Sequence, residues 1–161
     1  MHTIEGTQSA KGFRFAIVVS KYNDFVTDRL QTGAVAALTA AGVNAQNITV
    51  VRVPGAFEIP IAAQHAARSG KYDAVVCLGC VIRGDTPHFE YIASAVSHGI
   101  ANASAATGIP IAFGVLTTNS VEEAVERAGE GTSNKGWEAA AAAIEMVGVV
   151  AQLARGDGPA R

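Results

Sequence analysis

The chain has 161 residues, of which 49% are hydrophobic and 16% are charged, and its formal net charge is −2. This length suits a single domain, which we assign to residues 1–161, and the few charges indicate apolar contacts between subunits. The charge balance and the lack of a basic run argue against a nucleic-acid partner. No apolar run of membrane-spanning length and no signal peptide are evident, so we expect no membrane partner and a cytoplasmic location.

Apolar stretches of strand length alternate with segments of helical character along the chain. After an N-terminal arm (1–11) we expect, in chain order, a strand at 13–20, a helix at 23–41, a strand at 48–53, a helix at 59–70, a strand at 72–82, a helix at 87–106, a strand at 109–117, a short helix at 120–129, a loop at 131–136, a helix at 137–154 and a disordered tail at 156–161. This alternation predicts an α/β fold with three layers, in which a central four-stranded parallel sheet carries helices on both faces.

The two cysteines, Cys77 and Cys80, lie inside the third predicted strand. Three residues apart on a strand, their Cα atoms would be about 10 Å apart, which is too far for a disulfide. Two cysteines without nearby ligands also make a poor zinc site. We therefore expect two reduced core residues.

The turn that follows the third strand is the strongest candidate for chemistry. Gly84 precedes Thr86, a good helix N-cap, and Pro87 suits the first helical position. His88 would then lie in the first turn of a helix, at the carboxyl end of a strand, where open α/β sheets bind ligands and free N–H groups bind anions. The helix dipole would favour a neutral imidazole that can transfer protons. A lone histidine is more often a surface residue, but its neighbours favour a functional role.

Two further strand ends carry candidate binding residues. Tyr22 follows the first strand, and Ala56, Phe57 and Glu58 follow the second. Tyr22 and Phe57 could stack on a flat heterocycle, and Glu58 could accept hydrogen bonds from ring N–H groups or sugar hydroxyls. Each residue alone has a simpler interpretation, as a surface aromatic or a helix-start glutamate. Their convergence with His88 is the stronger signal.

Nucleotide-binding motifs fit this chain poorly. The frame from Gly79 to Thr86 resembles a P-loop, but Asp85 stands where the phosphate-binding lysine must be. The first strand–helix turn, 20–24, has no glycine for a dinucleotide site. The pattern is still compatible with one phosphate group bound by the backbone amides of Asp85 and Thr86. Arg127 and Lys135 could also bind phosphate, although Arg127 could equally compensate a helix dipole. Phe113, in mid-strand, would ordinarily belong to the core.

Several motifs together resemble the lumazine synthase (6,7-dimethyl-8-ribityllumazine synthase) family, from about residue 13 to residue 154. The matching segments, in family order and spacing, are PGAFEIP at 54–60, GCVIRGDTPHFEY at 79–91, FGVLTT at 113–118, ERAG at 126–129 and NKG at 134–136. The resemblance implies a flavodoxin-like fold and the condensation of 5-amino-6-(D-ribitylamino)uracil with 3,4-dihydroxy-2-butanone 4-phosphate in riboflavin synthesis, without a metal or cofactor. It also implies a homopentamer that in some members forms a sixty-subunit icosahedral capsid, with riboflavin synthase as a further partner.

The same resemblance implies roles for individual residues. His88 would transfer protons. The pyrimidine and its ribityl chain would contact Tyr22, Ala56, Phe57, Glu58, Cys80, Val81, Ile82 and Phe113. The butanone phosphate would be held by Asp85, Thr86, Arg127 and Lys135, and the Phe113 and Arg127 side of each site would come from the adjacent subunit. Tyr22 replaces the more usual Phe or Trp, and Asp85 replaces a small or neutral residue beside the phosphate.

Two other functions compete with the enzyme. A flavin- or lumazine-binding module would use the same fold and pocket with little turnover, and a shell-forming protein would need no pocket at all. The presence of His88, Arg127 and Lys135 favours the enzyme, because a binding module would not need all three.

Overall fold

The computed structural model describes residues 1–156, which contain one four-stranded parallel sheet in the order β2-β1-β3-β4. The strands are β1 (Phe15–Ser20), β2 (Ile48–Val53), β3 (Ala74–Ile82) and β4 (Ile111–Thr118). The helices are α1 (Asp24–Ala40), α2 (Ile59–Arg68), α3 (His88–Thr107), α4 (Val121–Arg127) and α5 (Lys135–Arg155), with short 3₁₀ turns η1 (Ala45–Asn47) and η2 (Ala56–Glu58). The predicted order of elements is confirmed, although most ends shift by one or two residues.

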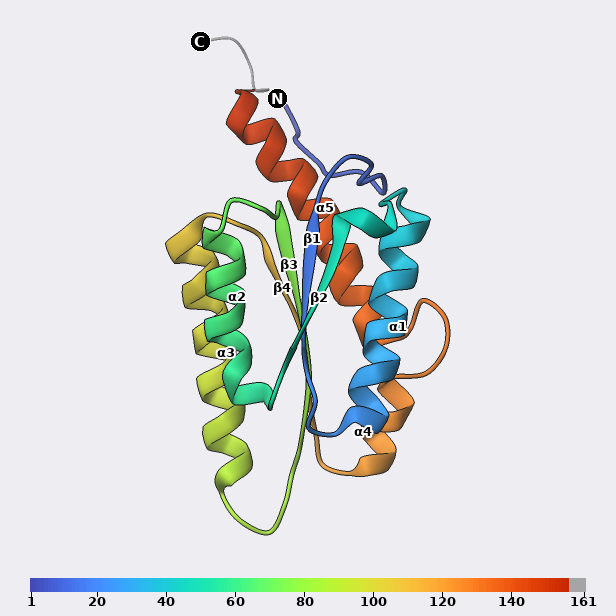
Figure 1. The fold of residues 1–161 in the computed structure, drawn as a ribbon, viewed down its shortest axis with the longest axis vertical. Helices are drawn as coiled ribbons and strands as arrows, with labels where there is room; N and C mark the ends of the chain where they lie inside the picture. The colour runs from blue at the N-terminus through green and yellow to red at the C-terminus, as the bar shows by residue number, and fades with distance from the viewer. Residues whose placement is uncertain (157–161) are drawn as a thin grey trace.

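Helices cover both faces of the sheet, so the fold is a three-layer, flavodoxin-like α/β/α arrangement. In Figure 1, α2 and α3 lie on one side of the strands, and α1, α4 and α5 lie on the other. The parallel crossovers require this placement, because each connection must carry the chain back along one face of the sheet. All strands therefore end at the same rim.

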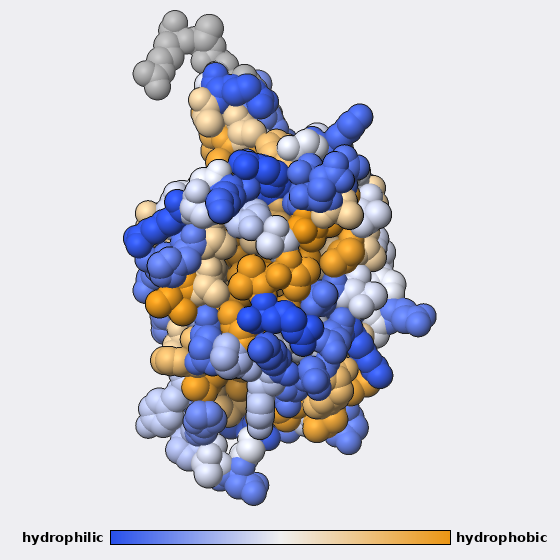
Figure 2. Space-filling model, in the orientation of Figure 1, coloured by the Kyte–Doolittle hydropathy of each residue, from blue (hydrophilic) through white to orange (hydrophobic). Residues whose placement is uncertain are grey.

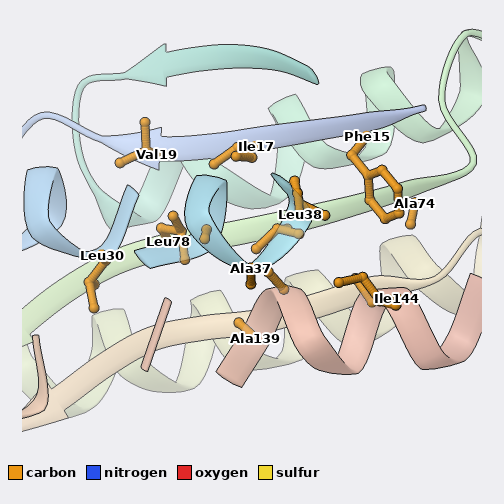
Figure 3. Close-up of a cluster of buried hydrophobic side chains, with 14 of the residues drawn as sticks. Phe15, Ile17, Val19, Leu30, Ala37, Leu38, Ala74, Leu78, Ala139 and Ile144 are labelled. Carbon is orange, nitrogen blue, oxygen red and sulfur yellow. The ribbon is translucent and has the colours of Figure 1, made fainter. Parts of the chain in front are cut away.

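The core is split into two apolar clusters, one on each face of the sheet. Figure 3 shows the larger cluster, where β1 side chains such as Phe15 and Ile17 meet Leu38 of α1 and Ile144 of α5. β1 and most of β3 are buried on both faces, as expected for the central strands of a parallel sheet. Both cysteines are free and buried in these clusters, which confirms their predicted state.

The predicted starts of two helices are wrong. Pro87, not Thr86, is the N-cap of α3, and no side chain within the described residues caps that helix. α5 begins at Lys135 rather than at Trp137, so Lys135 is helical and not part of a loop. The cause is Asn134, whose Oδ1 accepts hydrogen bonds from the N–H groups of Gly136 (2.8 Å) and Trp137 (3.1 Å).

Asn134 also fixes the junction between α1 and α5. Its Nδ2 donates to the carbonyl of Arg29 in α1 (3.2 Å) and to the carbonyl of Gly129 (2.8 Å). The two helices approach so closely here that a Cβ on Gly136 would lie 2.0 Å from the Leu30 carbonyl oxygen. Glycine is therefore required at 136 for the two helices to pack, and it does not mark a loop.

The N-terminal arm and α5 form one end of the molecule. The arm runs beside α5 (Figure 1), and the Gln152 side chain donates to the Glu5 carbonyl. By length and composition α5 could also cross a membrane, so the expectation that no segment reaches that length is wrong for this helix. One such helix is weak evidence of a membrane span, and α5 packs along α1 and the sheet, although only 28% of its most apolar window is buried within the chain. The predicted disordered tail falls beyond the described residues, except for Gly156, the C-cap of α5.

Candidate active site at the carboxyl rim

The loops that follow β1, β2 and β3 enclose a cavity of about 570 Å³. Parallel pairing brings these loops together: Ser20 at the end of β1 pairs with Val53 at the end of β2, and β1 also pairs in parallel with β3, which ends at Ile82. The cavity collects nine of the predicted site residues: Tyr22, Ala56, Phe57, Glu58, Cys80, Val81, Ile82, Thr86 and His88. The sequence-based prediction that these loops line one rim is confirmed.

Two exposed aromatic side chains border this cavity. Tyr22 is 73% exposed and Phe57 is 59% exposed, so neither ring is used in the core of the chain. The backbone beneath Tyr22 is fixed, because its N–H donates to the Pro54 carbonyl (3.0 Å) in the turn that follows β2. Rings that stay in solvent on a fixed backbone are available to stack on a flat ligand.

The base of the cavity is apolar and includes Cys80. Burial raises the pKa of Cys80 to about 11, so its thiol stays protonated at neutral pH. Burial also raises the pKa of Cys77, which lies deeper in β3. Neither thiol is therefore suited to act as a nucleophile, and Cys80 contributes a small apolar surface.

His88 is the first residue of α3 and lines the cavity from its solvent side. No described side chain caps α3, so the N–H groups of its first two residues stay available to an anion, whereas the Glu90 N–H donates to the Pro87 carbonyl (3.1 Å). Thr86 lines the cavity instead of capping the helix. Asp85 is exposed and is not part of the cavity lining.

The remaining predicted residues lie elsewhere in the chain. Phe113 and Lys135 border a second, smaller cavity of about 300 Å³ between β4 and α5. The expectation that a mid-strand Phe113 belongs to the core is wrong, because its side chain is 47% exposed at an edge strand. Lys135 pairs with Glu138 (Nζ–Oε2 2.9 Å), and Arg127, which borders neither cavity, donates to the Glu123 carbonyl (3.1 Å).

Six residues that border the first cavity were not predicted as site residues, and three of them, Asn23, Phe89 and Ile92, contribute side chains of functional interest. Asn23 was expected only as a helix cap, yet it adopts a left-handed conformation (φ 62°) and its Nδ2 donates to the Cys80 carbonyl at 3.0 Å. Phe89 and Ile92 line the cavity from the first turns of α3. Their spacing of three residues places both on one helix face, which is a signal that the sequence offered. Within residues 1–156, no group of three or more His, Cys, Asp or Glu side chains is arranged to hold a metal ion.

A flavodoxin-like sheet with a ligand cavity at its carboxyl rim defines the class of protein. The profile of the 6,7-dimethyl-8-ribityllumazine synthase family matches residues 12–151. The chain is 56% identical to the enzyme of that name from Desulfatibacillum aliphaticivorans, over 93% of this chain and 97% of the relative. It is 57% identical to the enzyme of the same name from Syntrophus aciditrophicus (strain SB), over 92% of this chain and 97% of the relative. The chain therefore belongs to the 6,7-dimethyl-8-ribityllumazine synthase family.

Proposed function

We propose that the chain condenses 5-amino-6-(D-ribitylamino)uracil with 3,4-dihydroxy-2-butanone 4-phosphate to give 6,7-dimethyl-8-ribityllumazine, in riboflavin biosynthesis. The chain belongs to this family, and the observation that carries the proposal is its first cavity. It joins two exposed aromatic rings to a histidine at an uncapped helix N-terminus. A flat pyrimidine fits between such rings, and a phosphate fits the helix N-terminus.

The reaction needs few catalytic groups. The pyrimidine amine attacks the ketone, water leaves as the Schiff base forms, phosphate is eliminated, and the ring closes with loss of a second water. Each step moves a proton near neutral pH, which suits His88 as general acid and base. Much of the acceleration would come from holding two substrates in one cavity. Glu58 would hydrogen-bond the pyrimidine or its ribityl chain, and the amides at Asp85 and Thr86 would hold the phosphate.

We also propose that each site is completed by a second copy of the chain, in a homopentamer or a larger shell. Three features support shared sites. Phe113 and Lys135 lie at a separate cavity, β2 is an edge strand with Val50 exposed, and much of α5 is not buried within the chain. Figure 2 shows apolar surface gathered in the middle of the face on which β2 lies. A cytoplasmic location and an association with riboflavin synthase stay predictions.

A turnover assay tests the proposed reaction. The purified chain is mixed with the ribitylamino-uracil and the butanone phosphate, and lumazine formation is followed against the uncatalysed background. A rate of lumazine formation that is proportional to the amount of the chain supports the proposed enzymatic activity. A background rate from folded, oligomeric protein would contradict it and would favour a binding or shell-forming role.

A further inference from the structure

The segment between β3 and α3 carries the proposed chemistry but has few anchors of its own. Residues 83–88 are exposed, Gly84 offers no side chain, and no described side chain caps α3. The amides at 85 and 86 can meet a phosphate only if their positions are fixed. The contacts that fix this segment must therefore come from its two ends.

Arg83 supplies those contacts at the end of β3. Its guanidinium group pairs with the Glu90 carboxylate in the first turn of α3 and lies 4.5 Å from the centroid of the Phe89 ring. Arg83 thus contacts the helix that begins with His88 without lining the cavity, whereas Phe89 does line it. One side chain spans the whole turn from the end of the strand to the start of the helix.

A second set of bonds connects Arg83 to the neighbouring strand. Its Nε donates to Oδ1 of Asn119 (2.9 Å), and its backbone N–H donates to the Thr118 carbonyl at the end of β4 (2.8 Å). Asn119 is itself held, because its N–H donates to Oε2 of Glu123 (2.9 Å) in the first turn of α4. The guanidinium group therefore connects α3 to the turn between β4 and α4.

The exposure of this cluster argues against a role in stability. The Arg83 and Glu90 side chains are 47% and 52% exposed, and ion pairs between exposed side chains contribute little to folding. A planar guanidinium that stacks on a ring and forms directed bonds on two sides is suited to fixing geometry, which a lysine cannot reproduce.

We propose that Arg83 is a positioning residue that acts through Phe89 and Glu90 to place His88 and the amides of residues 85 and 86. The inference rests on the proposed function, because it assigns the geometry of that same site. Displacement of this segment would weaken binding of the phosphorylated substrate and slow proton transfer. Binding of the pyrimidine, which depends on Tyr22 and Phe57 from other loops, would change little.

The test compares Arg83→Met with Arg14→Met. Arg14 is a matched control, because it is also 47% exposed and also pairs with a carboxylate (Asp73, 3.7 Å), at the opposite end of the sheet. We expect Arg83→Met to lower kcat and to raise KM for the butanone phosphate, each by roughly tenfold, since small misplacements are costly in catalysis. KM for the pyrimidine should stay within about twofold, and Arg14→Met should match the original chain.

Two further variants separate positioning from simple charge loss. Arg83→Lys keeps the positive charge but not the planar stack, so it should restore only part of the activity. Glu90→Gln removes the ion pair and leaves the contact with Phe89, so its effect should be smaller than that of Arg83→Met. The Arg83 hydrogen bond lowers the pKa of the Glu90 carboxyl, so that pKa should rise in Arg83→Met, as followed by carboxyl-carbon NMR.

The outcomes distinguish this inference from the proposed function. If the original chain shows no turnover, the proposed function fails. If it turns over and Arg83→Met keeps its kcat and both KM values, Arg83 has no positioning role. A fall in kcat that only tracks a loss of folded protein, with both KM values unchanged, would also overturn the inference in favour of a structural role.

Discussion

The cavity at the carboxyl rim and the cavity between β4 and α5 differ in how many predicted site residues they contain. The first, of about 570 Å³, draws its residues from loops after three adjacent strands and combines aromatic, acidic and histidine side chains. The second, of about 300 Å³, comprises the middle of β4 and the start of α5, where Phe113 and Lys135 face solvent. The first gathers nine of the predicted site residues, whereas the second carries only Phe113 and Lys135 of that set and has the character of a half-site. In the proposed assembly, the second cavity of one copy would complete the first cavity of the next.

The largest expected effect comes from His88. His88→Ala should lower kcat by roughly a hundredfold without changing the size of the oligomer, because general acid–base catalysis is lost while subunit contacts stay intact. Steady-state turnover and sedimentation velocity measure the two properties. His98→Ala is the matched control, since His98 is also exposed on α3 and bonds within its own helix to the Ser94 carbonyl. Full activity in His88→Ala would remove this residue from the mechanism.

Tyr22 should show the next largest effect. Tyr22→Ala removes a ring that is 73% exposed in the single chain, so we expect KM for the pyrimidine to rise by roughly tenfold. Tyr22→Phe keeps the ring and should bind the pyrimidine as the original chain does. Titration of the free ribitylamino-uracil by calorimetry provides the measurement. Equal affinity in both variants would show that Tyr22 does not stack on the ligand.

Mixed oligomers test whether one site draws residues from two copies of the chain. His88→Ala and Arg127→Ala chains, each expected to be nearly inactive, are unfolded together and reassembled at equal amounts. If one site combines His88 of one copy with Arg127 of the next, about a quarter of the sites regain both residues, and the same share of activity returns. The separately reassembled variants are the control. No recovery in verified mixed oligomers would place both residues in one subunit's site and contradict shared sites.

The smallest effect concerns Asp85. Its carboxylate stands next to the proposed phosphate site, so Asp85→Ala should lower KM for the butanone phosphate by about threefold as like-charge repulsion is removed. The fall should shrink at high salt, because the carboxylate is exposed. Asp24→Ala, at the start of α1, is the control for a general change in charge. An unchanged KM in Asp85→Ala would show that the carboxylate points away from the phosphate.

The sequence was sufficient for the fold and for one of the two cavities. Strand–helix alternation predicts the parallel sheet, and parallel strands bring Tyr22, Phe57 and His88 to one rim through short loops. The pattern could not place Phe113, because its exposure depends on β4 being an edge strand, which is a property of strand order. Strand order is set by contacts between distant segments, and a local pattern does not record them.

The starts of two helices, α3 and α5, were predicted less well, because local cap chemistry does not decide them alone. Thr86 has the right chemistry for a cap, but the chain leaves α3 uncapped and turns Thr86 toward the cavity. Asn134 does cap α5 and thereby makes Lys135 helical. Cap propensity identifies residues that can cap a helix, and tertiary contacts decide which of them do.

Asn134 has a consequence for which substitutions the chain can tolerate. Asparagine and aspartate are nearly equivalent as helix caps, because both offer an oxygen to the first N–H groups. At 134 the equivalence fails, because the side-chain nitrogen also donates to the carbonyls of Arg29 and Gly129. Aspartate would direct a second oxygen at two carbonyl oxygens in a buried position. Deamidation of Asn134 would therefore weaken the packing between α1 and α5. The long-term chemical stability of the fold thus depends on an amide that does not line the first cavity.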